Sequence, residues 1–408
     1  MAPAREALVR RSTILLGVAQ AALWGVLAIW VSTSPVHVAD LTGRRYWAGI
    51  AVAIYTLSAA AGALLGGRLM DRVGRRPGLA GGYSLIFASS VVISFSDTWL
   101  GGVVAATVAL GFGAGVALLG RGAVAEMYPP ENRARWVGVV LLAGTAGAVG
   151  GAPGAGLLAS SFGEASHHAV VWLSAAVLGL IGLLSTAALR PDPRDLAVDV
   201  APTSGGERRR PLGEMFRQPP LRAALATVAV SQMAMIGIMG VASVVVQDHG
   251  GTTTASAVVV SLHLGAMFAF SPLIGVFLDR RGRKPGLLAG GAVSITGALI
   301  GAVAEGTLLF GVGLFLVGIG WSVAYLGATA VVSDVTTATE RQGVLGVVDL
   351  VTHGSSTIGA LAGGFLLDSG GLTMLGLVMG AILVPALVLV ALLREPSPGR
   401  WAVARQGG

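Results

Sequence analysis

The sequence predicts an all-α fold that crosses a membrane many times. Of its 408 residues, 54% are hydrophobic and only 12% are charged, whereas an average soluble domain has about 25% charged residues. The 62 glycines suit membrane helices, in which small residues allow close approach. The apolar runs are long and lack the alternating pattern of a membrane β-barrel. These observations predict a polytopic membrane protein built from helices.

Twelve apolar runs are each long enough for a membrane helix, which needs about 20 residues. The first run follows basic residues, as in a signal peptide, but it is too long for a signal core, so we expect a retained span. The predicted spans cover residues 13–36, 46–66, 78–96, 99–127, 135–160, 168–189, 221–246, 253–277, 286–304, 307–333, 342–367 and 372–393.

The basic residues predict the orientation of these spans. An even number of spans places both termini on one side, and all 27 Lys and Arg residues except Arg44 and Arg45 fall on that side or at its helix ends. Cytoplasmic loops concentrate Lys and Arg, so we expect a multi-pass plasma (inner) membrane protein with both termini in the cytoplasm. The net charge of +7 then reflects topology, and we expect no binding to nucleic acid.

The chain is expected to divide into two six-helix bundles. Residues 1–189 form the N-terminal bundle, and residues 221–394 form the C-terminal bundle. Residues 190–220 are rich in proline, glycine and charge, which predicts a cytoplasmic linker. Residues 395–408 are expected to form a cytoplasmic tail.

A charged segment occurs twice, once in each bundle. The stretch GRLMDRVGRRPGL begins at Gly67 and the stretch GVFLDRRGRKPGL begins at Gly275, a shift of 208 residues. The same shift places Glu126 on Asp334 and Arg133 on Arg341. Because acids and arginines match as well as glycines, the shift indicates a duplicated six-helix unit. Two halves related by an axis along the membrane normal are typical of secondary transporters.

These segments resemble the loop signature of the major facilitator superfamily, and the resemblance covers the whole chain. It is carried by Gly67, Asp71, Arg72, Gly74 and Arg75 in the first loop and by Asp279, Arg280, Gly282 and Arg283 in the second. Glu126 with Arg133, and Asp334 with Arg341, resemble acid–arginine pairs of that family. The resemblance implies twelve spans in two pseudo-symmetric bundles around a midplane cavity.

The charges of the two loops predict a gate on the cytoplasmic face. Asp71 and Asp279 can accept from free backbone N–H groups or from arginine, and the loop arginines can pair with the acids of spans 4 and 10. Breaking a buried pair costs about 3–5 kcal/mol when one partner stays unpaired. We therefore expect a latch that holds the outward-open state. A set of arginines that only orients the spans is the alternative.

Two further segments bear on proton antiport. The glycine-rich residues 144–156 resemble an antiporter signature of the family, except that Ala152 separates Gly151 from Pro153, and either a hinge or close packing would explain them. Thr107 occupies a position where many antiporters of the family carry arginine, which argues against antiport. Arg121 is expected to pair with Glu126.

Asp349 and His353 are polar residues inside the eleventh predicted span. They lie four residues apart and therefore on one helix face, while Leu141 and Thr145 occupy the matching positions of the first half. Charges at this depth are costly and usually functional. We expect a proton-coupling site, or else a structural pair between Asp349 and Arg72 or Arg75.

Seven other residues are candidates for a substrate cavity near the membrane midplane. Mid-span Trp and Tyr rings can contact an apolar or cationic ligand, and methionine adapts to irregular shapes. Packing inside the helix bundle is the alternative for each, and is the more common role for a lone histidine. The candidates are Trp24, Tyr55, Gln232, Met235, His263, Trp321 and Tyr325.

The function expected from these features is secondary active transport by a monomer. Enzyme activity is not expected, because Lys284, the only lysine, precedes Pro285 and cannot complete a phosphate loop. Neither a cofactor nor a metal is expected. We expect proton-coupled export of a hydrophobic or amphiphilic drug or metabolite. Proton-coupled uptake of a small nutrient, or a receptor or assembly factor that transports nothing, is the alternative.

Overall fold

The structure is a computed structural model that describes residues 2–96, 98–198, 211–336 and 338–393. The predicted tail and much of the predicted linker lie outside these residues. The side chains of Arg133 and Arg341, which were assigned to the gate, also lie outside the description.

The described residues form helices and contain no strand, which confirms the all-α prediction. The N half contains α1 (Ala2–Thr42), α2 (Tyr46–Val73), α3 (Arg75–Ser94), α4 (Leu100–Leu118), α5 (Gly120–Met127), α6 (Pro130–Ser160), α7 (Glu164–Ala187) and the short η1 (Pro193–Leu196). The C half contains α8 (Leu212–Met215), α9 (Pro219–Met239), α10 (Ala242–Asp248), α11 (Thr253–Ala269), α12 (Ser271–Arg281), α13 (Arg283–Ala302), α14 (Thr307–Val335), α15 (Ala338–Ala381) and α16 (Val384–Leu392).

Ten helical segments of the described chain are long and apolar enough to cross a membrane, or eleven when α11 and α12, bent by 42°, form one span. One of the ten, Val347–Leu392, has 46 residues. A straight helix of that length would measure about 70 Å, more than twice a bilayer core. Its chain instead turns back at Gly371, where φ is +67°. Counting its two arms separately accounts for the twelve predicted spans.

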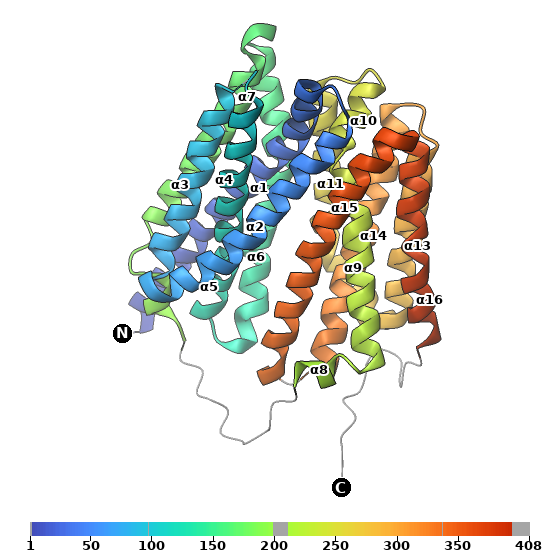
Figure 1. The fold of residues 1–408 in the computed structure, drawn as a ribbon. Helices are drawn as coiled ribbons and strands as arrows, with labels where there is room; N and C mark the ends of the chain where they lie inside the picture. Colours follow the sequence, from blue (N-terminus) through green and yellow to red (C-terminus); the bar gives the residue numbers. More distant parts are fainter. Residues whose placement is uncertain (1, 97, 199–210, 337, 394–408) are drawn as a thin grey trace.

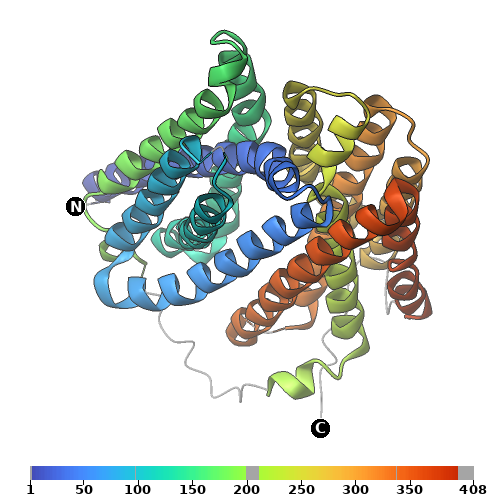
Figure 2. The ribbon, with the colours of Figure 1, turned by 45° about the horizontal axis from the view of Figure 1, so that its top comes forward.

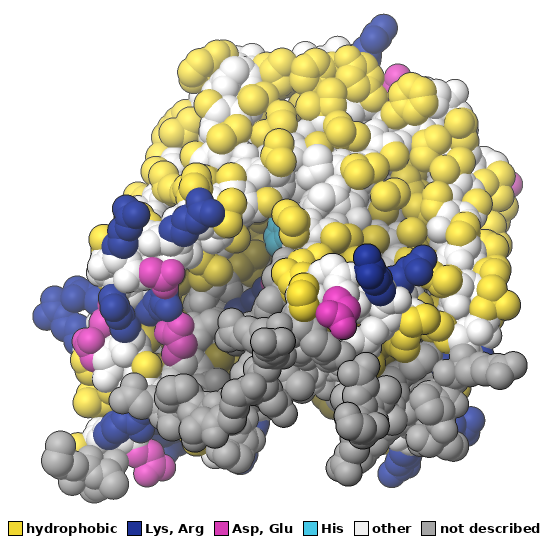
Figure 3. Space-filling view, turned by 60° about the horizontal axis from the view of Figure 1, so that its bottom comes forward, with side chains coloured by type: hydrophobic (Ala, Val, Ile, Leu, Met, Phe, Trp, Pro, Cys, Tyr) yellow, Lys and Arg dark blue, Asp and Glu magenta, His cyan; other side chains and the backbone are white. Residues whose placement is uncertain are grey.

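The two halves lie side by side, and their helices run alternately up and down (Figures 1 and 2). This alternation places both charged loops, at Gly74 and Gly282, on the face that carries α8 in Figure 1. We call this the basic face, because Lys and Arg side chains gather on it (Figure 3). The opposite face carries α10 and the turn between α1 and α2.

The halves are in close contact towards the face opposite the basic face. Gly49 of α2 packs against Ala360 and Gly364 of α15, and a Cβ on Gly49 would lie 2.9 Å from the Gly364 Cα. Arg45 and Asp248 form an ion pair of 3.0 Å between the halves at that face. The basic face, in contrast, is recessed between the halves (Figure 3). The interface is therefore accessible from the basic side.

Candidate functional site

The first charged loop is an ion-pair cluster around Arg75. Its guanidinium donates to Asp71 at 2.8 Å and to both carboxylate oxygens of Glu126, at 3.0 and 2.7 Å. Such two-point contact between arginine and a carboxylate fixes orientation as well as charge. Arg72 and Asp71 lie at the exposed surface, while Arg75 is half-buried.

The second charged loop repeats this arrangement. Arg283 donates to Asp279 at 2.7 Å and to Asp334 at 3.1 Å, and Arg280 is exposed. Both turns depend on glycine, because φ is +99° at Gly74 and +96° at Gly282. Residues other than glycine rarely adopt this conformation.

The ion pairs of both loops stay inside one half. Arg75 and Glu126 both belong to the N half, and Arg283 and Asp334 both belong to the C half. These pairs therefore do not hold the halves together in this conformation, although the sequence predicted a latch that would separate when the halves move apart. Each pair instead fixes its turn to the end of the fourth span in the same half.

The first part of the linker also belongs to this site, which sequence reasoning missed. The Asp192 carboxylate accepts from the backbone N–H groups of Arg75, at 3.1 Å, and Arg76, at 2.9 Å. It thereby satisfies free N–H groups at the start of α3, as a helix cap does. Arg194 donates to the Asp71 carbonyl at 3.1 Å. Asp192 and Arg194 thus hold the start of the linker against the first loop.

Among the described residues, one charged contact crosses between the halves on the basic side. Arg121 of α5 lies 4.0 Å from the Asp349 carboxylate of α15. This geometry corrects two predictions. Arg121 pairs with Asp349 rather than with Glu126, and the basic partner of Asp349 is Arg121 rather than an arginine of the first loop.

His353 lies one helical turn from Asp349, as predicted. Its Nδ1 donates to the Asp349 carbonyl oxygen at 2.8 Å, and this bond leaves Nε2 unused. The ring is half-buried, and Thr357 follows on the same helix with its hydroxyl 3.1 Å from that of Thr56 in the N half. A polar contact between α2 and α15, at Thr56 and Thr357, thus lies further along α15 from Asp349.

Four aromatic rings form a continuous set of contacts that we call the aromatic bridge: Trp24, Phe268, Trp321 and Tyr325. Trp24 meets Phe268 edge to face at 4.9 Å, across the interface between the halves. Phe268 meets Trp321 at 6.3 Å, and Trp321 stacks on Tyr325 at 5.1 Å with 14° between the rings. The sequence identified three of these residues but not Phe268.

Gln232 is tied to this bridge by hydrogen bonds. Its Oε1 accepts from the Trp321 indole at 2.6 Å, and its Nε2 donates to the Ser356 hydroxyl at 2.8 Å. These two bonds fix the orientation of the amide. Gln232 therefore stays a cavity candidate, and Ser356 joins it.

The other three cavity candidates lie in different surroundings. Tyr55 is half-buried and stacks on Trp30 at 4.3 Å, within the N half. His263 of α11 has no exposed surface. Its ring faces α14, where Nδ1 donates to the Leu314 carbonyl at 2.7 Å. Met235 is also buried. His263 thus has a packing role, while Met235, which is buried as Gln232 and Trp321 are, stays a cavity candidate.

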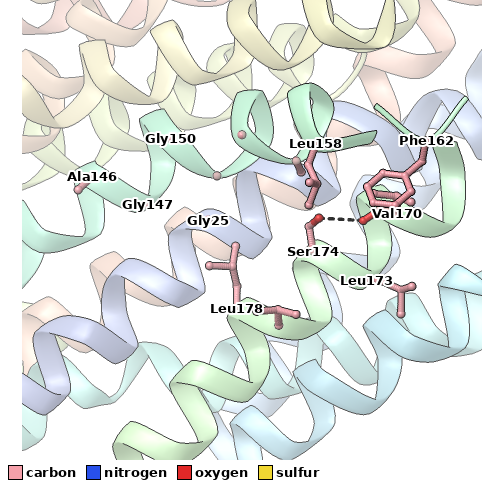
Figure 4. Close-up of a pocket in the computed structure, with 14 residues that line it drawn as sticks. Gly25, Ala146, Gly147, Gly150, Leu158, Phe162, Val170, Leu173, Ser174 and Leu178 are labelled. Carbon is pink, nitrogen blue, oxygen red and sulfur yellow. Dashed lines mark hydrogen bonds between the residues drawn. The ribbon is translucent and has the colours of Figure 1, made fainter. Parts of the chain in front are cut away.

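The glycines of residues 144–156 pack α6 closely against α1. Gly147 lies against the Ala21 backbone, and Gly151 lies against Gly25. Beside this contact is a groove of about 640 Å³, lined by α1, α6 and α7 and almost entirely apolar (Figure 4). Its hydroxyl group, on Ser174, donates to the Val170 carbonyl. Because all its lining residues belong to the N half, this groove is distinct from the site between the halves.

Comparisons with known proteins match the family resemblance. The family model described as Major Facilitator Superfamily matches residues 11–262 and 224–408. The uncharacterized MFS-type transporter YdeG of Bacillus subtilis is 28% identical over 398 residues, covering 94% of this chain and 93% of YdeG. The riboflavin transporter RfnT of Brucella anthropi is 28% identical over 397 residues, covering 95% of this chain and 96% of RfnT.

A solved structure has the same fold. The crystal structure of a D-xylose-proton symporter matches with a TM-score of 0.69 and 16% sequence identity, over 94% of this chain and 95% of the symporter. At this identity the match concerns the arrangement of the helices and not the ligand.

Proposed function

Because the chain belongs to the Major Facilitator Superfamily, we propose that it is a secondary active transporter that exports a hydrophobic or amphiphilic small molecule in exchange for protons. The basic face is the cytoplasmic face in this proposal, since cytoplasmic loops concentrate Lys and Arg. The conformation described above is then open to the cytoplasm, with the outer side closed at Gly49, Gly364 and the Arg45–Asp248 pair.

The observation that carries the proton coupling is the contact between Arg121 and Asp349. The two residues belong to different halves, so their distance changes when the halves rock. A ligand shifts a conformational equilibrium only by binding the two states with different affinity. A proton on Asp349 meets this condition, because it removes the charge that Arg121 attracts. His353, with Nε2 available, is the second proton carrier on the same helix face.

The apolar character of the site supports an amphiphilic substrate. The aromatic bridge supplies ring faces, and Gln232 supplies polar atoms. A phosphate or dicarboxylate would need a cluster of basic side chains, and Arg121 is the basic side chain at this site among the described residues. The charged part of the site is thus suited to one proton or one ion pair rather than to a multiply charged substrate.

Transport assays in liposomes test this proposal. Ligands are first found by thermal-shift screening of the purified protein, and their flux is then driven by a pH gradient. Coupling between the binding of two ligands is typically about 5- to 150-fold, and we expect Asp349→Asn to remove the coupling between proton and substrate while substrate binding persists. Asp195→Asn, in the exposed part of the linker, is the matched control and should transport as the wild type does. Unchanged pH dependence in Asp349→Asn would refute the coupling.

A second candidate is proton-coupled uptake of a small nutrient. It is favoured by the similarity to RfnT over nearly the whole chain, since riboflavin is a nutrient. The direction of flux relative to the imposed pH gradient distinguishes uptake from export. If no compound moves and a protein partner co-purifies instead, a receptor or assembly factor would replace both.

A further inference from the structure

We propose that the ligand of this transporter is a neutral, planar, fused-ring heteroaromatic compound with an amide- or imide-type edge, bound on the aromatic bridge with that edge at Gln232. The inference rests on the proposed transport function and deepens it by naming the class of substrate and the residues that select it.

The first argument comes from the arrangement of the rings. The stacked pair of Trp321 and Tyr325 presents nearly parallel faces, and Phe268 stands almost perpendicular to Trp321, at 81°. Aromatic rings favour offset stacking and edge-to-face contact, and both geometries suit a flat ligand. Trp24, Phe268 and Tyr325 are only half-buried, so their rings retain surface that a ligand can contact.

The second argument comes from the Gln232 amide. An amide oxygen accepts two hydrogen bonds, and its NH₂ group donates two. Trp321 and Ser356 use one of each, and both partners hold the amide in one orientation. These two bonds leave one acceptor site and one donor site of the amide unused, on a side chain that is 7% exposed. An amide or imide edge, with a carbonyl beside an N–H, matches this pair of sites.

The third argument comes from charge. Among the described residues, the charged groups at the bridge are Arg121 and Asp349, both at its Tyr325 end. The side chains that make ring contacts or hydrogen bonds with Trp24, Phe268 and Gln232 among these residues are uncharged. Burying a charge without a partner is costly, so a ligand that covers the bridge should be neutral there.

The location gives the bridge a role in transport. The contact between Trp24 and Phe268 is the ring pair that joins the two halves among the described residues. When the halves rock, this contact must open or shift. A flat ligand at this position touches both halves. Movement of the halves can therefore expose it first to one side of the membrane and then to the other.

Fluorescence titration with lumichrome tests the proposal. Lumichrome is a fluorescent, fused tricyclic ring system with an imide edge, and stacking on Trp or Tyr quenches such fluorophores. We expect saturable quenching by the purified full-length protein in detergent. Glutarimide carries the edge without the rings, and 1-adamantanol is apolar but not flat. Each should compete at least about tenfold more weakly than an unlabelled planar analogue.

Variants locate the site. Trp321→Leu should weaken lumichrome binding about tenfold, and Tyr325→Leu should weaken it several-fold. Trp99→Leu, at an exposed tryptophan outside the bridge, is the matched control and should bind normally. If Trp321→Leu does not yield monodisperse protein, the half-buried Tyr325 carries the test. Wild-type affinity in Tyr325→Leu would overturn the placement.

The edge contact has its own test. Gln232→Leu should weaken binding of lumichrome but have little effect on its N1,N3-dimethyl derivative, which lacks both ring N–H groups that stand beside a carbonyl. Equal losses for both ligands would overturn the contact with Gln232. Competition by 1-adamantanol as strong as that by a planar compound would overturn the planar class.

The outcomes separate this inference from the proposed function. If an aliphatic amphiphile is transported under a pH gradient and lumichrome does not bind, the ligand class is wrong and the transport function stands. If lumichrome binds at the bridge but no solute is moved, the binding site stands and the transport function is wrong.

Discussion

The two charged loops have nearly the same sequence but are held by different surroundings. In the N half, Arg75 makes two contacts with Glu126, and Asp192 of the linker caps the helix that follows. In the C half, Arg283 makes one contact with Asp334, and the pair is more enclosed. The exposed fraction of the acid side chain is 18% for Asp334 and 36% for Glu126.

The basic residue that follows Arg75 or Arg283 makes a similar contact in each half, although the residue itself differs. Arg76 donates to the carbonyl of Ala187, at the end of α7. Lys284, at the matching position, donates to the carbonyls of Ala391 and Leu393, at the end of α16. Both residues fix their loop to the last span of the half. Among the described residues, the duplication therefore kept the turn and these attachments, and Asp192 of the linker adds a further contact in the N half.

The comparison predicts a larger loss of stability for Arg283→Ala than for Arg75→Ala. Removing Arg283 leaves the more enclosed Asp334 without its guanidinium, which should cost about 2–3 kcal/mol. Removing Arg75 leaves Glu126 closer to water, and about 1–2 kcal/mol is expected. Thermal unfolding in one detergent measures both, with the exposed Arg68→Ala as control. A larger shift for Arg75→Ala would show that contact number outweighs burial.

The turn glycines give a sharper comparison, because their backbone angles agree within a few degrees. Alanine at either position is strained, at about 1–3 kcal/mol. Gly74→Ala should cost more than backbone strain alone, since a Cβ on Gly74 would lie 2.7 Å from the Asp192 Oδ2. This additional cost should vanish when Asp192→Ala is added. Gly81→Ala, with nothing within 4 Å of the new Cβ, is the control. An unchanged cost of Gly74→Ala in the Asp192→Ala background would contradict the expected contact with Asp192.

The smallest expected effect is that of the linker contact alone. Asp192→Ala removes the cap of α3 and should lower stability by about 1 kcal/mol. Asp192→Asn keeps an acceptor oxygen and should lower it less. Faster hydrogen exchange at Arg75 and Arg76 would report the lost cap directly, and the exposed Asp195→Ala should leave exchange unchanged. Normal exchange in Asp192→Ala would mean that the linker is not needed to hold the loop.

Much of the fold was predictable from the sequence. Apolar length predicted the spans, and the shift of 208 residues paired Asp71 with Asp279 and Glu126 with Asp334, which occupy equivalent places in the structure. The spacing of residues within one half was enough to predict these positions, because both partners of each ion pair belong to the same half.

Contacts between the halves were not predictable in the same way. The partner of Asp349 is Arg121, and nothing in the spacing of either half connects them. Phe268 was missed for a similar reason, since only the docking of α1 against α11 brings it to Trp24. Asp192 was missed because a proline- and charge-rich segment predicts a linker, while its side chain is ordered by the free N–H groups of α3.

The contact between Gly49 and Gly364 bears on how easily the outer side can open. Two helices that touch through bare backbone have no side chains wedged between them. At this point they can slide or separate without parting interlocked side chains, while the Arg45–Asp248 pair must break. A bulkier residue at either position would keep the two helices apart and prevent the outer side from closing. It would therefore favour the outward-open conformation.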